Sequence, residues 1–340
     1  MPKKKSPKVE EEDTVFEPEV EVVGQYPTLL RKKTGLYSFD AALSHNGNMG
    51  LPLRCIVELA GKEGSGKSTL AYYLSGVVTE TGNISICDIE LADPKYVKYA
   101  TGIGGFKGRV TMIDAINEKQ EMIPHEVMME NLVKGLIDEN TGAGIFDSVS
   151  AIQPLAEKKG DLGEAFMGKR AKLVAQLSRQ LSTALREKKR PSSAFVVNHH
   201  YQILGSHGHT TAGGVVLPAL AGVRAALWVS EAFYSDDHKP YGFVVSGALE
   251  KLRFGGKGGR FQFYTVPGFG VHPGVSAMFD CFELGLAERD KSGRVKLDGK
   301  SLGYIRTDLL SYAAEGKTRK FLPFLELVSE QMKRDEQING

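Results

Sequence analysis

One eight-residue segment, GKEGSGKS at residues 61–68, constrains this chain more than any other feature. It follows a strand-like run, RCIVEL, and precedes a helix-like run. Glycines let such a loop curl so that its backbone N–H groups face phosphate oxygens, and the start of the helix adds its positive dipole end. The pattern predicts an ATP site in which Lys67 reaches the β- and γ-phosphates and Ser68 binds Mg²⁺. The expected loop residues are Gly61, Lys62, Glu63, Gly64, Ser65, Gly66, Lys67, Ser68 and Thr69.

Apolar runs of strand length alternate with helix-like segments from about residue 35 onward. The strand-like runs are 55–59, 84–87, 110–113, 144–146 and 194–197, and the helix-like segments are 68–79, 125–136 and 164–188. This alternation predicts an α/β fold with a mostly parallel sheet covered by helices on both faces. Three further strand-like runs between residues 225 and 266 are joined by turn-rich links, which indicates an antiparallel extension of that sheet.

Composition divides the chain into four parts. Residues 1–33 form a charged tail and an arm, 34–270 the α/β core, 271–332 a small C-terminal α+β module, and 333–340 a tail. The module contains a possible hairpin at SGRVKLDGKSLG. Within the arm, VFEPEVEVV alternates partly at period two. It is either a strand packed on its own core or an arm that adds to a neighbouring subunit.

Composition also limits the class of protein. No run approaches the roughly 18 apolar residues of a membrane helix, and the N-terminus has no apolar signal region. The lack of such a run predicts no membrane contact. The three cysteines, Cys55, Cys87 and Cys281, are far apart, which predicts reduced thiols in a cytoplasmic protein. A net charge of +2 neither favours nor excludes a nucleic-acid partner, so that question depends on local charge.

Polar residues follow three of the predicted strands. Ligands of parallel sheets bind beyond the carboxyl ends of the strands, so these side chains are candidates for the ATP site. Asp147 ends AGIFD and is the expected second Mg²⁺ ligand. Glu90 follows another strand and is the expected base that orients or deprotonates the attacking water. His199 ends FVVNH and would contact the γ-phosphate. Two alternatives stay open: Asp147 could only cap a turn, and Glu90 could lie at a solvated strand end.

Together these segments resemble the RecA family of DNA strand-exchange recombinases and, in details, their T4-type phage relatives. The similarity covers roughly residues 34–320 and includes CDIELADPKY, FDSVSAIQP, HTTAGG and LEKLRF. It implies a RecA-type P-loop ATPase core with Glu90 as general base, and it places Asp93 and Tyr96 at the nucleotide, with Tyr96 stacking on adenine. It further implies that Lys251 and Arg253 enter the ATP site of the next subunit.

The resemblance also implies two DNA-binding loops, at residues 157–167 and 202–214. Met167 would wedge between bases, while Gly213 and Gly214 would let backbone amides approach phosphates. A basic row follows the first loop on the predicted helix, formed by Lys169, Lys172 and Arg179. Such a row is often only a solvated face, but its position after the first loop favours contact with DNA phosphates.

By resemblance, the chain is a DNA-dependent ATPase that uses ATP and Mg²⁺, forms helical filaments on single-stranded DNA and pairs that strand with duplex DNA. Its expected catalytic residues are Glu90, Lys67, His199, Lys251 and Arg253. Expected partners are DNA, further copies of the chain, and single-strand-binding and mediator proteins, in a bacterial or phage-infected cytoplasm. Two alternatives stay open: a hexameric ring helicase on the same core, and an ATP-binding protein that is not a motor.

The chain departs from the bacterial RecA pattern at three places. His199 stands where RecA itself has glutamine, although the phage relatives have histidine. Arg253 replaces one of two lysines, which keeps the positive charge and adds a planar fork suited to phosphate. The chain ends EQMKRDEQING and not in a long acidic tail, so regulation by such a tail is not expected.

Overall fold

The computed structural model describes residues 30–159, 168–202, 209–256 and 258–339. The segment VFEPEVEVV, Met167 and much of both expected DNA-binding loops lie outside these residues. Among the described residues, no helix combines the length and apolar character that a membrane crossing requires. The three cysteines are buried and free.

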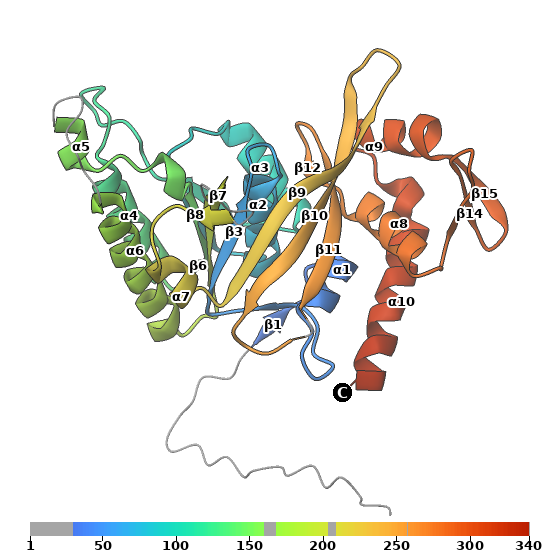
Figure 1. Cartoon of the computed structure of the whole chain (residues 1–340), viewed down its shortest axis with the longest axis horizontal. Coiled ribbons are helices and arrows are strands. Elements are labelled where there is room, and N and C mark those ends of the chain that lie inside the picture. Colours follow the sequence, from blue (N-terminus) through green and yellow to red (C-terminus); the bar gives the residue numbers. More distant parts are fainter. Residues whose placement is uncertain (1–29, 160–167, 203–208, 257, 340) are drawn as a thin grey trace, which may run out of the picture.

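The described part of the chain contains a ten-stranded sheet in the order β12-β11-β10-β9-β3-β7-β6-β4-β5, with β8 paired to β7 (Figure 1). Its central strands are β3 (Ile56–Gly61), β4 (Asn83–Asp88), β5 (Arg109–Met112), β6 (Thr141–Asp147), β7 (Ser193–Gln202) and β9 (Val223–Tyr234), paired in parallel. Next to β9, the strands β10 (Pro240–Leu252), β11 (Gly259–Val266) and β12 (Gly270–Val271) pair antiparallel, as does β8 (His209–Thr211) with β7. The predicted mostly parallel sheet with an antiparallel extension is thereby confirmed.

Helices cover both faces of this sheet. The helices α2 (Lys67–Thr79) and α3 (Pro94–Ile103) pack on one face, and α4 (His125–Ile137) and α6 (Lys169–Glu187) on the other (Figure 1). Successive strand residues point to opposite layers, so Ile56 joins the α4–α6 core while Val57 joins the α2–α3 core. The helix α3 was not expected. It begins at Pro94 after Asp93, whose carboxylate accepts the Lys95 N–H at 2.9 Å.

The C-terminal module packs against the antiparallel end of the sheet. It comprises α8 (Pro273–Glu283), β13 (Glu288–Arg289), β14 (Arg294–Leu297), β15 (Lys300–Tyr304), α9 (Ser311–Ala314) and α10 (Leu322–Asn339). The hairpin expected at SGRVKLDGKSLG is present as β14 and β15. Residues 333–339, expected as a tail, instead continue α10. This end of the helix is held by a Tyr37–Asp335 hydrogen bond of 2.6 Å and a Lys33–Glu336 ion pair of 2.7 Å.

The remaining α-helices and β-strands of the described chain are short. They are β1 (Arg31–Lys32), α1 (Tyr37–Ala42), β2 (Leu51–Pro52), α5 (Leu155–Lys159) and α7 (Val216–Leu220). Of these, α7 matters most for the site, because it directly follows the end of the second expected DNA-binding loop.

Candidate functional site

The phosphate-binding motif forms the connection between β3 and α2, with Gly61 as the last strand residue and Lys67 as the first helical one. Two glycines are required by the local geometry. Gly66 precedes the helix with a φ of +79°, in the left-handed region that side chains disfavour. At Gly61, a Cβ atom would lie 2.4 Å from the carbonyl oxygen of Leu227. The loop therefore packs tightly against β9 while its helix end stays open to a ligand.

A cavity of about 270 Å³ lies over this loop. Its wall includes Glu63 to Thr69 from the loop and helix, together with Glu90, Tyr96 and His199 from three other segments. The structure thus brings together residues that the sequence only suggested as neighbours. The lining also includes Phe243 and residues 265–267 from the antiparallel part of the sheet, which sequence reasoning missed because no motif marks them.

The Lys67 side chain is buried beneath the P-loop. Its ammonium group donates a hydrogen bond of 2.7 Å to the carbonyl oxygen of Lys62. Burial lowers the pKa of Lys67, and the carboxylates of Asp147 and Glu90 act in the opposite direction. These surroundings hold the amine at the base of the cavity, where a phosphate oxygen is a stronger partner than a backbone carbonyl.

Asp147 ends β6 with its side chain almost fully buried. One carboxylate oxygen, Oδ1, has no hydrogen-bond partner among the described residues, and the other accepts a 3.4 Å contact from the Tyr72 hydroxyl. Burial raises the pKa of Asp147 to about 7, while the Ser68 hydroxyl opposes that shift. An unpartnered carboxylate oxygen beside a serine hydroxyl is a donor set that suits Mg²⁺. The residues present therefore fit the ion that the motif predicts.

Glu90 lies in a turn that a neighbouring carboxylate shapes. Asp88, at the end of β4, accepts the N–H groups of Glu90, Leu91 and Ala92 at 2.9, 3.0 and 2.6 Å. Asp88 is thus occupied with the backbone, whereas the Glu90 side chain is 45% exposed at the cavity. Glu90 Oε1 accepts a hydrogen bond from the Ser148 hydroxyl and lies 3.7 Å from His199 Nε2. Of these two acids, only Glu90 is placed to meet a water in the cavity.

His199 and Tyr96 complete the wall. Burial, followed by the charge of Lys67, lowers the pKa of His199, so its ring is neutral at pH 7. The Tyr96 hydroxyl shares a 2.8 Å hydrogen bond with the Thr69 hydroxyl, and its ring packs edge-on against Tyr72. Asp93 does not line the cavity; its carboxylate caps α3, so it positions the helix that carries Tyr96.

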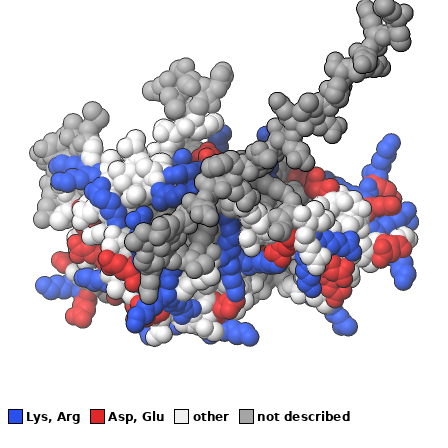
Figure 2. Space-filling model, turned by 90° about the horizontal axis from the view of Figure 1, so that it is seen from below, with Lys and Arg blue, Asp and Glu red and all other residues white. Residues whose placement is uncertain are grey.

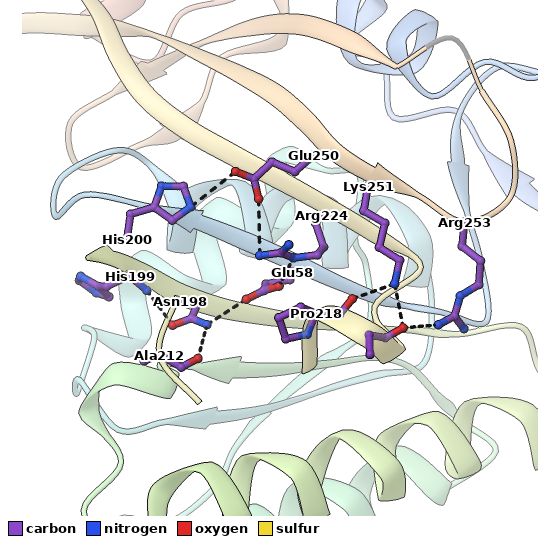
Figure 3. Close-up of polar contacts among 11 residues, drawn as sticks. Glu58, Asn198, His199, His200, Ala212, Pro218, Arg224, Glu250, Lys251 and Arg253 are labelled. Atoms are coloured by element: carbon purple, nitrogen blue, oxygen red, sulfur yellow. Dashed lines mark hydrogen bonds and ion pairs between the residues drawn. The ribbon is translucent and has the colours of Figure 1, made fainter. Parts of the chain in front are cut away.

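Lys251 and Arg253 lie apart from the cavity of their own subunit. The Lys251 ammonium group donates hydrogen bonds of 2.7 Å to the carbonyl oxygens of both Pro218 and Ala219. The Arg253 guanidinium group donates one of 2.6 Å to Ala219 (Figure 3). Both cations thus contact the last turn of α7, where helix carbonyls attract positive charge.

The end of the second expected DNA-binding loop, at Gly213 and Gly214, packs against α6. A Cβ atom at Gly213 would lie 2.8 Å from the Val174 side chain, and one at Gly214 would lie 3.2 Å from Ala171. Both neighbours belong to α6, so the end of the second loop rests on the helix that follows the first. On that helix Lys169, Lys172 and Arg179 are exposed, whereas Leu177, Leu181 and Ala184 are buried.

Charge is mixed on the face of the molecule that Figure 2 shows. In the view of Figure 2, Lys and Arg side chains alternate with Asp and Glu over one face of the molecule. This agrees with the small net charge. Any attraction for DNA must therefore come from local features such as the exposed row on α6.

The amino-acid sequence of the chain matches a known protein family. Residues 28–240 match the RecA N-terminal domain. The protein RecA of Streptomyces avermitilis is 30% identical over 196 residues, which cover 56% of this chain and 48% of the relative. RecA of Treponema denticola is 29% identical over 245 residues, covering 71% and 56%. RecA of Deinococcus radiodurans is 34% identical over 196 residues, covering 56% and 50%. The chain spans about half the length of the curated relatives it matches.

Proposed function

Since the chain belongs to the RecA family, we propose that it is an ATP-dependent DNA recombinase. It forms helical filaments on single-stranded DNA and catalyses homologous pairing and strand exchange with duplex DNA, as a DNA-dependent ATPase. One observation carries this proposal. Glu90 and His199 line the cavity over the P-loop, Asp147 ends β6 beside Ser68, and the chain runs on from β6 and β7 into the two expected DNA-binding loops.

In this proposal, the P-loop and Lys67 bind the phosphates of ATP. Ser68 and Asp147 would hold Mg²⁺, which when bound neutralises charge on the phosphates. Glu90 orients the attacking water and accepts its proton, and the Ser148 hydroxyl holds the carboxylate by donating to Oε1. The neutral ring of His199 offers the γ-phosphate a hydrogen bond that is lost once the phosphate departs.

The position of a second set of cations supports the proposal that ATP is hydrolysed at a subunit interface. Lys251 and Arg253 are next to each other at the end of β10 and reach no residue of their own phosphate cavity. In a filament they would approach the γ-phosphate held by the next subunit and neutralise its charge, as an arginine finger does. ATP would then hold two subunits together, and its hydrolysis would release them.

Arg253→Ala should abolish most of the stimulation of ATP turnover by single-stranded DNA while changing ATP affinity by less than about threefold, because the side chain acts on a neighbour's phosphate and not on its own. Turnover with and without DNA, together with titration of a fluorescent ATP analogue, measures both quantities. Arg109→Ala, which removes an exposed arginine on β5, is the matched control. Full stimulation in the Arg253 variant would refute the role in the neighbouring site.

DNA is proposed to lie along the two loops and the start of α6. Lys172 and Arg179 would contact phosphates from their exposed positions, with Lys169 beside them. Gly213 and Gly214, both with positive φ, would let the backbone approach the strand, and Met167 is proposed as the wedge between bases. These contacts carry no base preference, so base pairing between the strands supplies sequence identity.

This account is tested by strand exchange between circular single-stranded DNA and homologous linear duplex, with ATP and Mg²⁺. We expect joint molecules with homologous duplex and none with heterologous duplex. ATP-driven unwinding without pairing would instead favour a ring helicase, and nucleotide binding without either reaction would favour a protein that is not a motor. A bacterial or phage-infected cytoplasm, with single-strand-binding and mediator proteins as further partners, belongs to the same proposal.

A further inference from the structure

A carboxylate lies completely buried in the strand that leads to the P-loop. Glu58, on β3, has no exposed surface. Its Oε1 accepts a 2.9 Å hydrogen bond from the Asn198 amide, and its Oε2 accepts one of 2.6 Å from Arg224 Nε (Figure 3). A buried carboxylate is retained only when its charge and its oxygens are paired, and both conditions are met here. An apolar residue at this position would avoid the cost of burying a charge, so packing alone does not explain the acid.

The Asn198 side chain joins three parts of the molecule. Its amide nitrogen donates to Glu58 and also to the carbonyl oxygen of Ala212 at 3.0 Å. Its amide oxygen accepts the backbone N–H of His199 at 2.9 Å. One buried side chain therefore touches the P-loop strand, a residue of the phosphate cavity and the end of the second expected DNA-binding loop.

Arg224 extends the same network toward the other set of cations. It comes from β9, and besides Glu58 it approaches Glu250 of β10, with 3.5 Å between Arg224 NH2 and Glu250 Oε2. His200 Nε2 lies 3.9 Å from Glu250 Oε1. Glu250 immediately precedes Lys251 in the sequence. The network thus links side chains of four strands, β3, β7, β9 and β10 (Figure 3).

We propose that Glu58 is a positioning residue which, through Asn198, holds His199 and the end of the second loop in one arrangement and so transmits nucleotide state to that loop. This inference rests on the proposed function, because it assumes that the cavity binds ATP. A shift of His199 toward a phosphate moves its backbone N–H, and Asn198 carries that displacement to Ala212. Linkage requires the reverse as well, so DNA bound at the loop favours ATP at the cavity.

The test is hydrogen exchange of residues 209–216 in the full chain, measured with and without a non-hydrolysable ATP analogue. In the wild type we expect the analogue to slow exchange of these amides by about tenfold, since the loop end becomes ordered. Asn198→Ala and Glu58→Leu should each lose most of this response while binding the analogue within about threefold of the wild-type affinity. Glu58→Gln keeps an oxygen that accepts the Asn198 amide, so it should retain the response.

Ser193→Ala is the matched control, because Ser193 is a buried polar residue of the same strand as Asn198 and makes no hydrogen bond to the network. A general loss of stability would lower the melting temperature without selectively removing the nucleotide response. The inference is overturned if the wild-type loop does not respond to the analogue, or if either Glu58→Leu or Asn198→Ala keeps the full response. The readout needs no DNA, so a failure of strand exchange would refute the proposed function separately.

Discussion

Lys67→Ala is expected to abolish DNA binding that depends on ATP. The ammonium group of Lys67 is the buried cation at the base of the phosphate cavity, and it already donates a hydrogen bond there. Losing a charged hydrogen bond to phosphate should weaken ATP binding by about 10- to 100-fold. Because filament assembly on DNA is proposed to require ATP between subunits, DNA binding should fall below detection at ATP concentrations that saturate the wild type.

Fluorescence anisotropy of labelled single-stranded DNA, with and without ATP analogue, measures this effect. Lys107→Ala removes an exposed lysine far from the cavity lining and should bind DNA as the wild type does. Assembly of the Lys67 variant on DNA in the presence of ATP would show that nucleotide binding at the P-loop is not the condition for filament formation.

Glu90→Gln should keep ATP binding and slow turnover by about 100-fold or more, because an amide cannot accept the proton of the attacking water. The Ser148 hydroxyl can still donate to the remaining side-chain oxygen, so the geometry is largely preserved. A second consequence follows: with hydrolysis blocked, the ATP-bound filament on DNA should persist far longer than that of the wild type.

Single-turnover hydrolysis and the dissociation rate of the DNA complex measure the two consequences. Glu118→Gln, an exposed glutamate of the loop that follows β5, is the matched control. Wild-type turnover in the Glu90 variant would remove Glu90 from the role of base. Asp88 would not be the substitute, since its two oxygens are occupied by three backbone N–H groups.

The sequence predicted those parts of the molecule that depend on local pattern. The strand–loop–helix context of GKEGSGKS predicted the position of Lys67. The rule that ligands bind at strand ends predicted that Asp147, Glu90 and His199 lie at one edge of the sheet. Helix α3 is not among the predicted helices, although Asp93–Pro94 is a helix-start signal. The last turns of α10 were expected as a tail because they are charged, yet contacts with Tyr37 and Lys33 hold them.

The buried network could not be predicted in this way. Glu58 meets Asn198 and Arg224 across separations of 140 and 166 residues. Their contact depends on strand register and on which side chains share a layer of the sheet, and neither follows from a single sequence. The contacts of Lys251 and Arg253 with α7 were missed for the same reason. The roles of all these residues in ATP hydrolysis and DNA binding remain predictions.

The central claim is that ATP, held between subunits, stabilises a helical filament on single-stranded DNA. Electron microscopy of the full chain with single-stranded DNA and a non-hydrolysable ATP analogue tests it most directly, with ADP as the comparison. The account predicts long, extended helical filaments with the analogue and few or none with ADP. Closed rings, or particles whose form does not depend on the nucleotide, would contradict it.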